Sequence, residues 1–131
     1  MLTPSRRITS GSDFSRTLKL GARARRGAVV AHSVHIPSVW PDPAGIRRDL
    51  TTPSGLRCGL IVSKAVGNAV TRHRVARCLR VAADTVFDEL EQRARTQLLV
   101  VVRALPEAAD CSSTELTADL RAALRRTGAY E

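Results

Sequence analysis

Aromatic residues are scarce in this sequence, at only 3% of 131 residues, so aliphatic side chains and alanine must form the hydrophobic core. The apolar fraction of 44% is normal for a globular protein, and the length suits one domain over residues 1–131. No apolar run approaches the roughly 18 residues of a membrane-spanning helix. The first residues also lack the apolar stretch of a signal peptide. We therefore expect a cytoplasmic protein with no membrane partner.

Cysteine is also rare, and its three positions, Cys58, Cys78 and Cys111, lie far apart in the chain. An odd number of cysteines without a C-x-x-C pair argues against a disulfide framework or a zinc site. Reduced, buried thiols are the expectation, in keeping with a cytosolic protein.

Acidic residues are too few to balance the charge, since 12 Asp and Glu stand against 21 Lys and Arg. The net charge is +9 and the isoelectric point lies near 11.1. Only Lys19 and Lys64 are lysines, and arginine is the better bidentate partner for phosphate. A small domain this basic usually binds a polyanion, because phosphates relieve its self-repulsion and release counterions.

Hydrophobic spacing and turn residues divide the chain into alternating helices and strands. Ser10 with Asp13, and Ser112 with Glu115, resemble capping boxes, and Asn68 suits an N-cap. The expected elements are a basic mobile arm (1–9), a helix ending near Gly21, a short edge strand (22–26), a strand (28–36), a loop (37–56), a strand (57–66), a helix (69–93), a strand (96–104) and a helix beginning at Ser112. The order αβββαβα predicts an α+β fold, a two-layer α/β sandwich with helices against one sheet.

The stretch KAVGNAVTRHRVARCLR, residues 64–80, contains no acidic residue. At about 100° per residue, the predicted helix separates apolar and basic side chains onto opposite sides. One side carries Val75, Cys78, Leu79, Ala82 and Val86, and the other carries His73, Arg77 and Arg80, flanked by Arg72 and Arg74. Cations in the first turns of a helix are disfavoured by its dipole, and here they also lack acidic partners four residues away along the helix. A phosphate bound at this end of the helix would explain why the arginines are placed there. An ordinary solvated face is the alternative.

The segment SKAVGNAVTRHRVARCLR (63–80) resembles the signature of the bacterial ribonuclease P protein component, which is close to S-K-K-x-G-N-A-V-x-R-N-R-x-K-R-x-x-R. The likeness covers most of the chain. It implies a small α/β sandwich shared with a ribosomal-protein domain, with an unusual left-handed βαβ crossover. It also implies binding to ribonuclease P RNA and to the 5′ leader of precursor tRNA, whose endonucleolytic removal generates the mature tRNA 5′ end. The RNA would perform the hydrolysis with Mg²⁺, without catalytic residues or dedicated metal ligands from the protein.

The resemblance assigns roles to particular residues. Those that match the motif and should face RNA are Lys64, Asn68, Arg72, Arg74, Arg77 and Arg80, and His73 in the same run is also expected to bind RNA. Phe14, Leu18 and His32 fall where the family grips the leader, in a cleft between the first helix and the sheet. His73 replaces the middle Asn of the motif, and Ala76 replaces a usual Lys. Leu18 and His32 stand where the family often has aromatic residues, so stacking on the leader is expected to be weaker.

One alternative function stays open, and two others are disfavoured by the sequence. A general RNA-binding or ribosomal protein would use the same basic helix. A stand-alone nuclease is disfavoured, because the sequence shows no paired carboxylates in a loop and no metal-ligand cluster. A helix-turn-helix protein, and hence a DNA partner, is disfavoured because the basic helix follows a strand. From the residues alone, Phe14 would suit a hydrophobic core as well as a leader cleft, and His32 on an apolar strand face would normally be a core histidine, an alternative that the resemblance leaves open.

Overall fold

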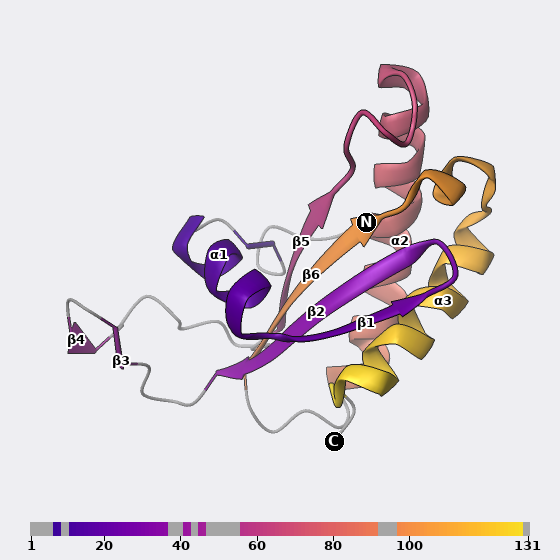
Figure 1. The fold of residues 1–131 in the computed structure, drawn as a ribbon. Coiled ribbons are helices and arrows are strands. Elements are labelled where there is room, and N and C mark those ends of the chain that lie inside the picture. Colours follow the sequence, from indigo (N-terminus) through magenta and orange to yellow (C-terminus); the bar gives the residue numbers. More distant parts are fainter. Residues whose placement is uncertain are drawn as a thin grey trace.

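The protein, described by a computed structural model, is built on one four-stranded sheet with helices on both faces (Figure 1). The structure describes residues 7–8, 11–36, 41–42, 45–46, 56–91 and 97–129. The elements are α1 (Gly11–Leu20), β1 (Ala22–Arg26), β2 (Val29–Ile36), β3 (Pro41–Asp42), β4 (Gly45–Ile46), β5 (Leu56–Ile61), α2 (Ala69–Glu91), β6 (Gln97–Ala104), the 3-10 helix η2 (Pro106–Asp110) and α3 (Ser113–Thr127). This order confirms the predicted α+β sandwich, to which the structure adds β3, β4 and η2.

The strands lie in the order β1-β2-β6-β5, and only β5 and β6 run parallel. A parallel pair needs a crossover from one end of the sheet to the other, and α2 supplies it. In Figure 1 both strands point upward, β6 lies to the right of β5, and α2 returns behind the sheet. The crossover is therefore left-handed, as expected, although about 98% of such connections are right-handed.

The hydrophobic core lies between the sheet and the layer formed by α2 and α3. Every second residue of β6 from Leu98 to Ala104 faces this core, and Val29 and Ala31 of β2 join it. The largest fully buried side chains are Phe87, Leu56, Leu79, Leu90, Leu98, Leu116, Leu120, Leu124, Val29, Val75 and Val86. β6 is buried on both faces from Leu98 to Val102, because α1 covers part of the opposite face. This confirms the buried strand predicted from the continuous apolar run.

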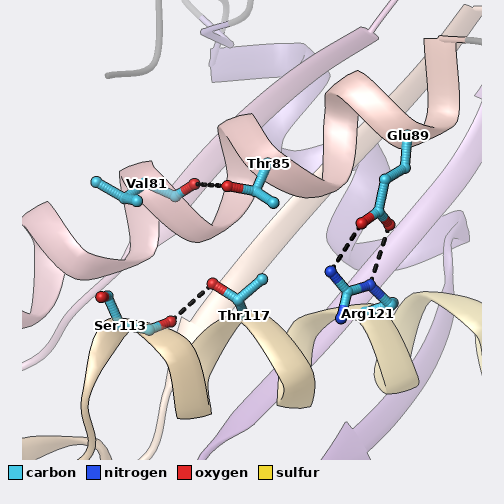
Figure 2. Close-up of polar contacts among 6 residues, drawn as sticks. All are labelled: Val81, Thr85, Glu89, Ser113, Thr117 and Arg121. Carbon is cyan, nitrogen blue, oxygen red and sulfur yellow. Dashed lines mark hydrogen bonds and ion pairs between the residues drawn. The ribbon is translucent and has the colours of Figure 1, made fainter.

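The helices α2 and α3 run in the same direction and are joined by an ion pair (Figure 2). Nε and Nη2 of Arg121 donate to the two carboxylate oxygens of Glu89 at 3.0 and 2.7 Å. A threonine lies one turn before each partner of this ion pair. The hydroxyl of Thr85 donates to the carbonyl of Val81 in α2 at 3.0 Å, and the hydroxyl of Thr117 donates to the carbonyl of Ser113 in α3 at 2.7 Å. The predicted capping box at the start of α3 is confirmed, with both of its hydrogen bonds at 3.1 Å.

The strand predicted over 57–66 is shorter than expected. β5 ends at Ile61, which pairs with Arg103 near the end of β6. The chain then turns through hydrogen bonds from Val66 N–H to the Ser63 carbonyl and from Gly67 N–H to the Lys64 carbonyl, at 3.1 and 3.2 Å. The apolar run was misleading because Val66 is buried by packing in the core rather than by strand pairing.

The loop predicted over 37–56 also contains regular structure. Pro41–Asp42 and Gly45–Ile46 form a short antiparallel pair, and Leu56 is already the buried first residue of β5. The remaining residues of this loop lie outside the described part of the chain. The predicted arm is partly ordered against the sheet, because the N–H of Ile8 donates to the Cys58 carbonyl at 3.0 Å. The other residues of the arm, and the capping box predicted at Ser10, lie outside the described residues.

All three cysteines are free thiols. Burial raises the pKa of Cys58 to about 12, so this thiol stays protonated. Burial of Cys58 confirms the expectation, whereas Cys78 and Cys111 are only half-buried at the edge of the core. Among the described residues, no helix is long and apolar enough to cross a membrane.

Candidate nucleic-acid interface

Asn68 begins α2, as its position between a turn and a helical pattern predicts. Its side-chain Oδ1 accepts from the N–H of Thr71 at 2.9 Å, and its carbonyl accepts from the N–H of Arg72 at the same distance. The first contact satisfies an orphan donor of the first turn, and the second is the first backbone hydrogen bond of the helix. The side-chain oxygen of Asn68 is therefore already engaged within the protein, although the residue as a whole is exposed.

The basic half of α2 has one buried side and one open side. Val75 and Leu79 are fully buried, whereas His73 and Arg77 are exposed and Arg72 is half-buried. The first turn of the helix contains no acidic residue. The sequence therefore predicted correctly which side of α2 is buried and which is exposed. The open side presents a run of cations.

A hollow, here called the α2 groove, opens on this side of the helix. It has a volume of about 250 Å³ and is lined by Val62, Ala69, Arg72, His73, Ala76 and Arg80. A second hollow, the α1 cleft, lies between α1 and β5. It has a volume of about 220 Å³ and is lined by Arg7, Ile8, Phe14, Cys58, Gly59, Leu60 and Arg80. Arg80 lines both hollows, so they are neighbours on one surface.

The ring of Phe14 lies against bare backbone in β5. A Cβ atom added at Gly59 would be only 2.4 Å from Cε2 of Phe14, so any larger residue would displace the ring. Glycine at this strand position therefore allows the close approach of an aromatic ring. The sequence identified Phe14 but missed Gly59, Arg7 and Ile8, although a glycine inside an apolar strand was the available signal.

His32 lies on the same face of the sheet as Gly59, two strands away. Gly59, Val101, His32 and Arg23 are successive partners across the sheet. Burial and the charges of Arg23 and Arg103 lower the pKa of His32 below its usual value. Its Nδ1 atom is buried and has no hydrogen-bond partner in the described part of the chain.

Leu18 and His32 were both predicted to lie with Phe14, but neither lines the α1 cleft. Leu18 is 39% exposed on α1, and His32 lies toward the β1 edge of the sheet. Lys64 is exposed in the turn before α2 rather than on a strand. The roles of these residues in RNA binding stay predictions. Among the described residues, no cluster of three or more His, Cys, Asp or Glu side chains is placed to hold a metal ion.

A comparison with known proteins identifies the group to which this fold belongs. The family model described as Ribonuclease P matches residues 2–128. The chain belongs to the ribonuclease P protein family. Ribonuclease P protein components from Corynebacterium urealyticum and Corynebacterium diphtheriae are 45% and 44% identical to it. The first match covers 96% of this chain and 98% of the relative, and the second covers 95% and 94%.

Solved structures agree with this membership at the level of the fold. Two structures of the RNase P protein from Staphylococcus aureus match with TM-scores of 0.65 and 0.67, at 21% and 22% identity. The first covers 96% of this chain and 98% of its own, and the second covers 100% and 96%. As a member of the ribonuclease P protein family, the chain is the protein component of a ribonucleoprotein endonuclease that processes tRNA.

Within the motif that marks the ribonuclease P protein family, Arg74 has a role inside the protein. Its Nη1 donates to the carbonyl of Cys111 at 3.3 Å, and its Nη2 donates to the carbonyl of Ala109. The guanidinium thus ties the second turn of α2 to η2 and to the residue that follows it. Contact of Arg74 with RNA stays a prediction, whereas its contact with these carbonyls is a feature of the fold.

Replacing Arg74 with alanine is expected to destabilise the protein. The change removes two hydrogen bonds from a charged donor, each of which contributes about 1.5–3 kcal/mol. We expect the free energy of unfolding, measured by urea denaturation, to fall by at least about 1.5 kcal/mol. Arg74→Lys should restore only part of it, because an ammonium lacks the planar fork. Arg77→Ala, at an exposed position one turn away, is the control, and equal stability of all variants would contradict the role.

Proposed function

We propose that this protein binds ribonuclease P RNA through the open side of α2 and grips the 5′ leader of precursor tRNA in the α1 cleft. It would thereby assist removal of the leader and formation of the mature tRNA 5′ end. The observation that carries the proposal is that Arg80 lines both hollows. A cationic helix face and a cleft containing an aromatic ring are therefore parts of one surface.

The charge of this surface supports RNA as the ligand. The exposed Arg77 and the half-buried Arg72 and Arg80 supply guanidinium groups suited to phosphate. The acidic residues of α2 whose surroundings are described, Asp84, Asp88 and Glu89, all follow this region, and Glu89 is paired with Arg121. Within the described part of the chain, no acidic residue of α2 therefore lies inside the basic run from Arg72 to Arg80.

The α1 cleft has the features of a single-strand site. Aromatic rings bind successive bases by stacking, and cationic side chains bind the backbone of the strand. Phe14 supplies a half-buried ring, and Arg7 and Arg80 lie in the same lining. We propose further that Mg²⁺ for hydrolysis is held by the RNA and the substrate, and that the protein acts in the cytoplasm.

Reconstitution tests this function directly. The purified protein alone is expected not to cleave precursor tRNA, but to raise cleavage by ribonuclease P RNA of the same genome at low Mg²⁺. A protein that leaves that RNA's activity unchanged would overturn the proposal. Competition with ribosomal RNA fragments addresses the other candidate, because a general RNA-binding or ribosomal protein would favour them and ignore the leader.

The titration of His32 tests a separate question, whether the leader extends beyond the α1 cleft toward the β1 edge of the same sheet face. In the free protein its pKa should lie below 6.5, because burial and the nearby Arg23 and Arg103 disfavour the imidazolium. An oligoribonucleotide bound beside these arginines would neutralise part of their charge and raise the pKa of His32. NMR of the ring protons, assigned with His32→Gln, measures this change. A pKa that does not move when a leader oligonucleotide binds would show that the strand avoids this face.

A further inference from the structure

The α2 groove is more specific than a charged surface. Four of its lining residues, Ala69, Arg72, Ala76 and Arg80, recur at three- and four-residue steps and so share one stripe of α2. Val62, which follows β5, closes the other side. The wall is therefore apolar and small, while two guanidinium groups and the His73 imidazole stand around it. A site that bound only phosphates would need the cations but not the hollow between them.

Ala76 is the residue that keeps the groove open. It lies four residues from both Arg72 and Arg80, between the two cations along the helix. A methyl group leaves space at this point, whereas the lysine of the pattern described above would extend into it. The hollow is thus linked to a position at which this sequence departs from that pattern.

Arg72 adds a second, independent observation. Its Nε atom is buried and has no hydrogen-bond partner in the described part of the chain. A buried donor without an acceptor is costly, by about 1–3 kcal/mol, and usually finds a partner in a ligand or an ordered water. Since Arg72 lines the groove, a rotation of its side chain would bring the Nε–H to an acceptor on a molecule in the groove.

The dimensions and chemistry of the groove select one class of occupant. A volume of about 250 Å³ is below the roughly 300–1,000 Å³ of drug-sized sites, so it suits a single small planar group. Guanidinium and imidazole planes stack on such rings, and apolar walls desolvate their faces. Proteins recognise RNA in this way when a base is unpaired and turned out of its helix.

We propose that the α2 groove takes one unpaired nucleobase of ribonuclease P RNA, stacked between the side chains of Arg72, His73 and Arg80. This inference rests on the proposed function, because it names the part of the RNA that the α2 face receives. An acceptor on the base edge or its phosphate then receives the Nε–H of Arg72. The contact reads an extruded nucleotide, which phosphate contacts alone cannot do.

Filling the groove without changing charge tests this inference. Ala76→Leu is expected to weaken binding of ribonuclease P RNA by roughly 5- to 150-fold, the equivalent of one stacked base. The dependence of affinity on salt should stay the same, because no cation is lost. Ala118→Leu, at an exposed position on α3, is the matched control and should leave affinity unchanged. Thermal melting of both variants establishes that they fold.

Nucleotide-resolution probing of Watson–Crick edges identifies the base. With the wild-type protein at saturation, one unpaired nucleotide should be protected, and with Ala76→Leu at saturation it should become reactive. Ala76→Lys should lose the same protection while steepening the salt dependence by roughly one contact. Unchanged affinity and protection in Ala76→Leu would overturn the nucleobase site alone. Failure of the wild-type protein to bind or stimulate the RNA would instead overturn the proposed function.

Discussion

Replacing Arg72, Arg77 and Arg80 together with alanine is expected to weaken binding of ribonuclease P RNA by roughly a thousandfold. The estimate takes about 1.5 kcal/mol, the lower end for a charge-assisted hydrogen bond, for each guanidinium. The three side chains lie on the open side of α2, where the first turn offers no acidic residue as an alternative partner. Each lost phosphate contact should also reduce the slope of log affinity against log salt by about 0.7–0.9.

The measurement is a salt series of binding isotherms for the isolated RNA, without substrate. Arg72→Ala and Arg77→Ala alone should each reduce the slope by roughly one unit or slightly less. A double change of Arg125 and Arg126 to alanine, in the last turn of α3, removes two cations from another surface and serves as the control, with the change in slope compared per cation removed. If the slope is the same for the triple variant and this control, the open side of α2 is only a solvated face.

Phe14→Ala is expected to separate substrate binding from RNA binding. Loss of one stacked base should weaken holoenzyme binding of precursor tRNA by roughly 5- to 150-fold. Mature tRNA, which lacks the leader, should bind as before, and so should ribonuclease P RNA. Leu20→Ala is the control on the same helix, since Leu20 is 67% exposed. An equal loss for both tRNAs would contradict the role of the cleft.

Gly59→Ala tests the same cleft without removing the ring. The added methyl would lie 2.4 Å from Cε2 of Phe14, so the ring must leave its position. We expect the same selective loss for precursor tRNA, with little effect on mature tRNA. A variant that binds precursor tRNA normally would show that the position of the ring on β5 does not matter to the leader.

Much of the fold could be predicted because its signals are local. The caps at Asn68 and Ser112 are confirmed by their hydrogen bonds, and each depends on residues within a few positions. The burial of β6 followed from an uninterrupted apolar run. The early end of β5 could not be predicted, because Val66 is buried by a turn that folds under α2 and not by a neighbouring strand.

The candidate site could be predicted only in part. The phase of α2 identified its open side, because helical geometry fixes which residues share a face. The seat of Phe14 on Gly59 joins residues 45 positions apart, and it depends on how α1 crosses the sheet. The hydrogen bonds of Arg74 could not be predicted either, because their acceptors are backbone carbonyls, which every residue has and which leave no signal in the sequence.

The position of β6 at the centre of the sheet also determines when this protein acquires its structure during synthesis. β2 and β5 both pair with β6 and not with each other, yet β6 is the last strand in the described part of the chain. At about 5–20 residues per second, a ribosome needs roughly 3–12 s to travel from the end of β2 to the start of β6. Until then the nascent main sheet can consist only of the β1–β2 hairpin, which is marginal alone. The ribosome therefore synthesises the basic helix α2 before the four-stranded sheet on which α2 packs can form.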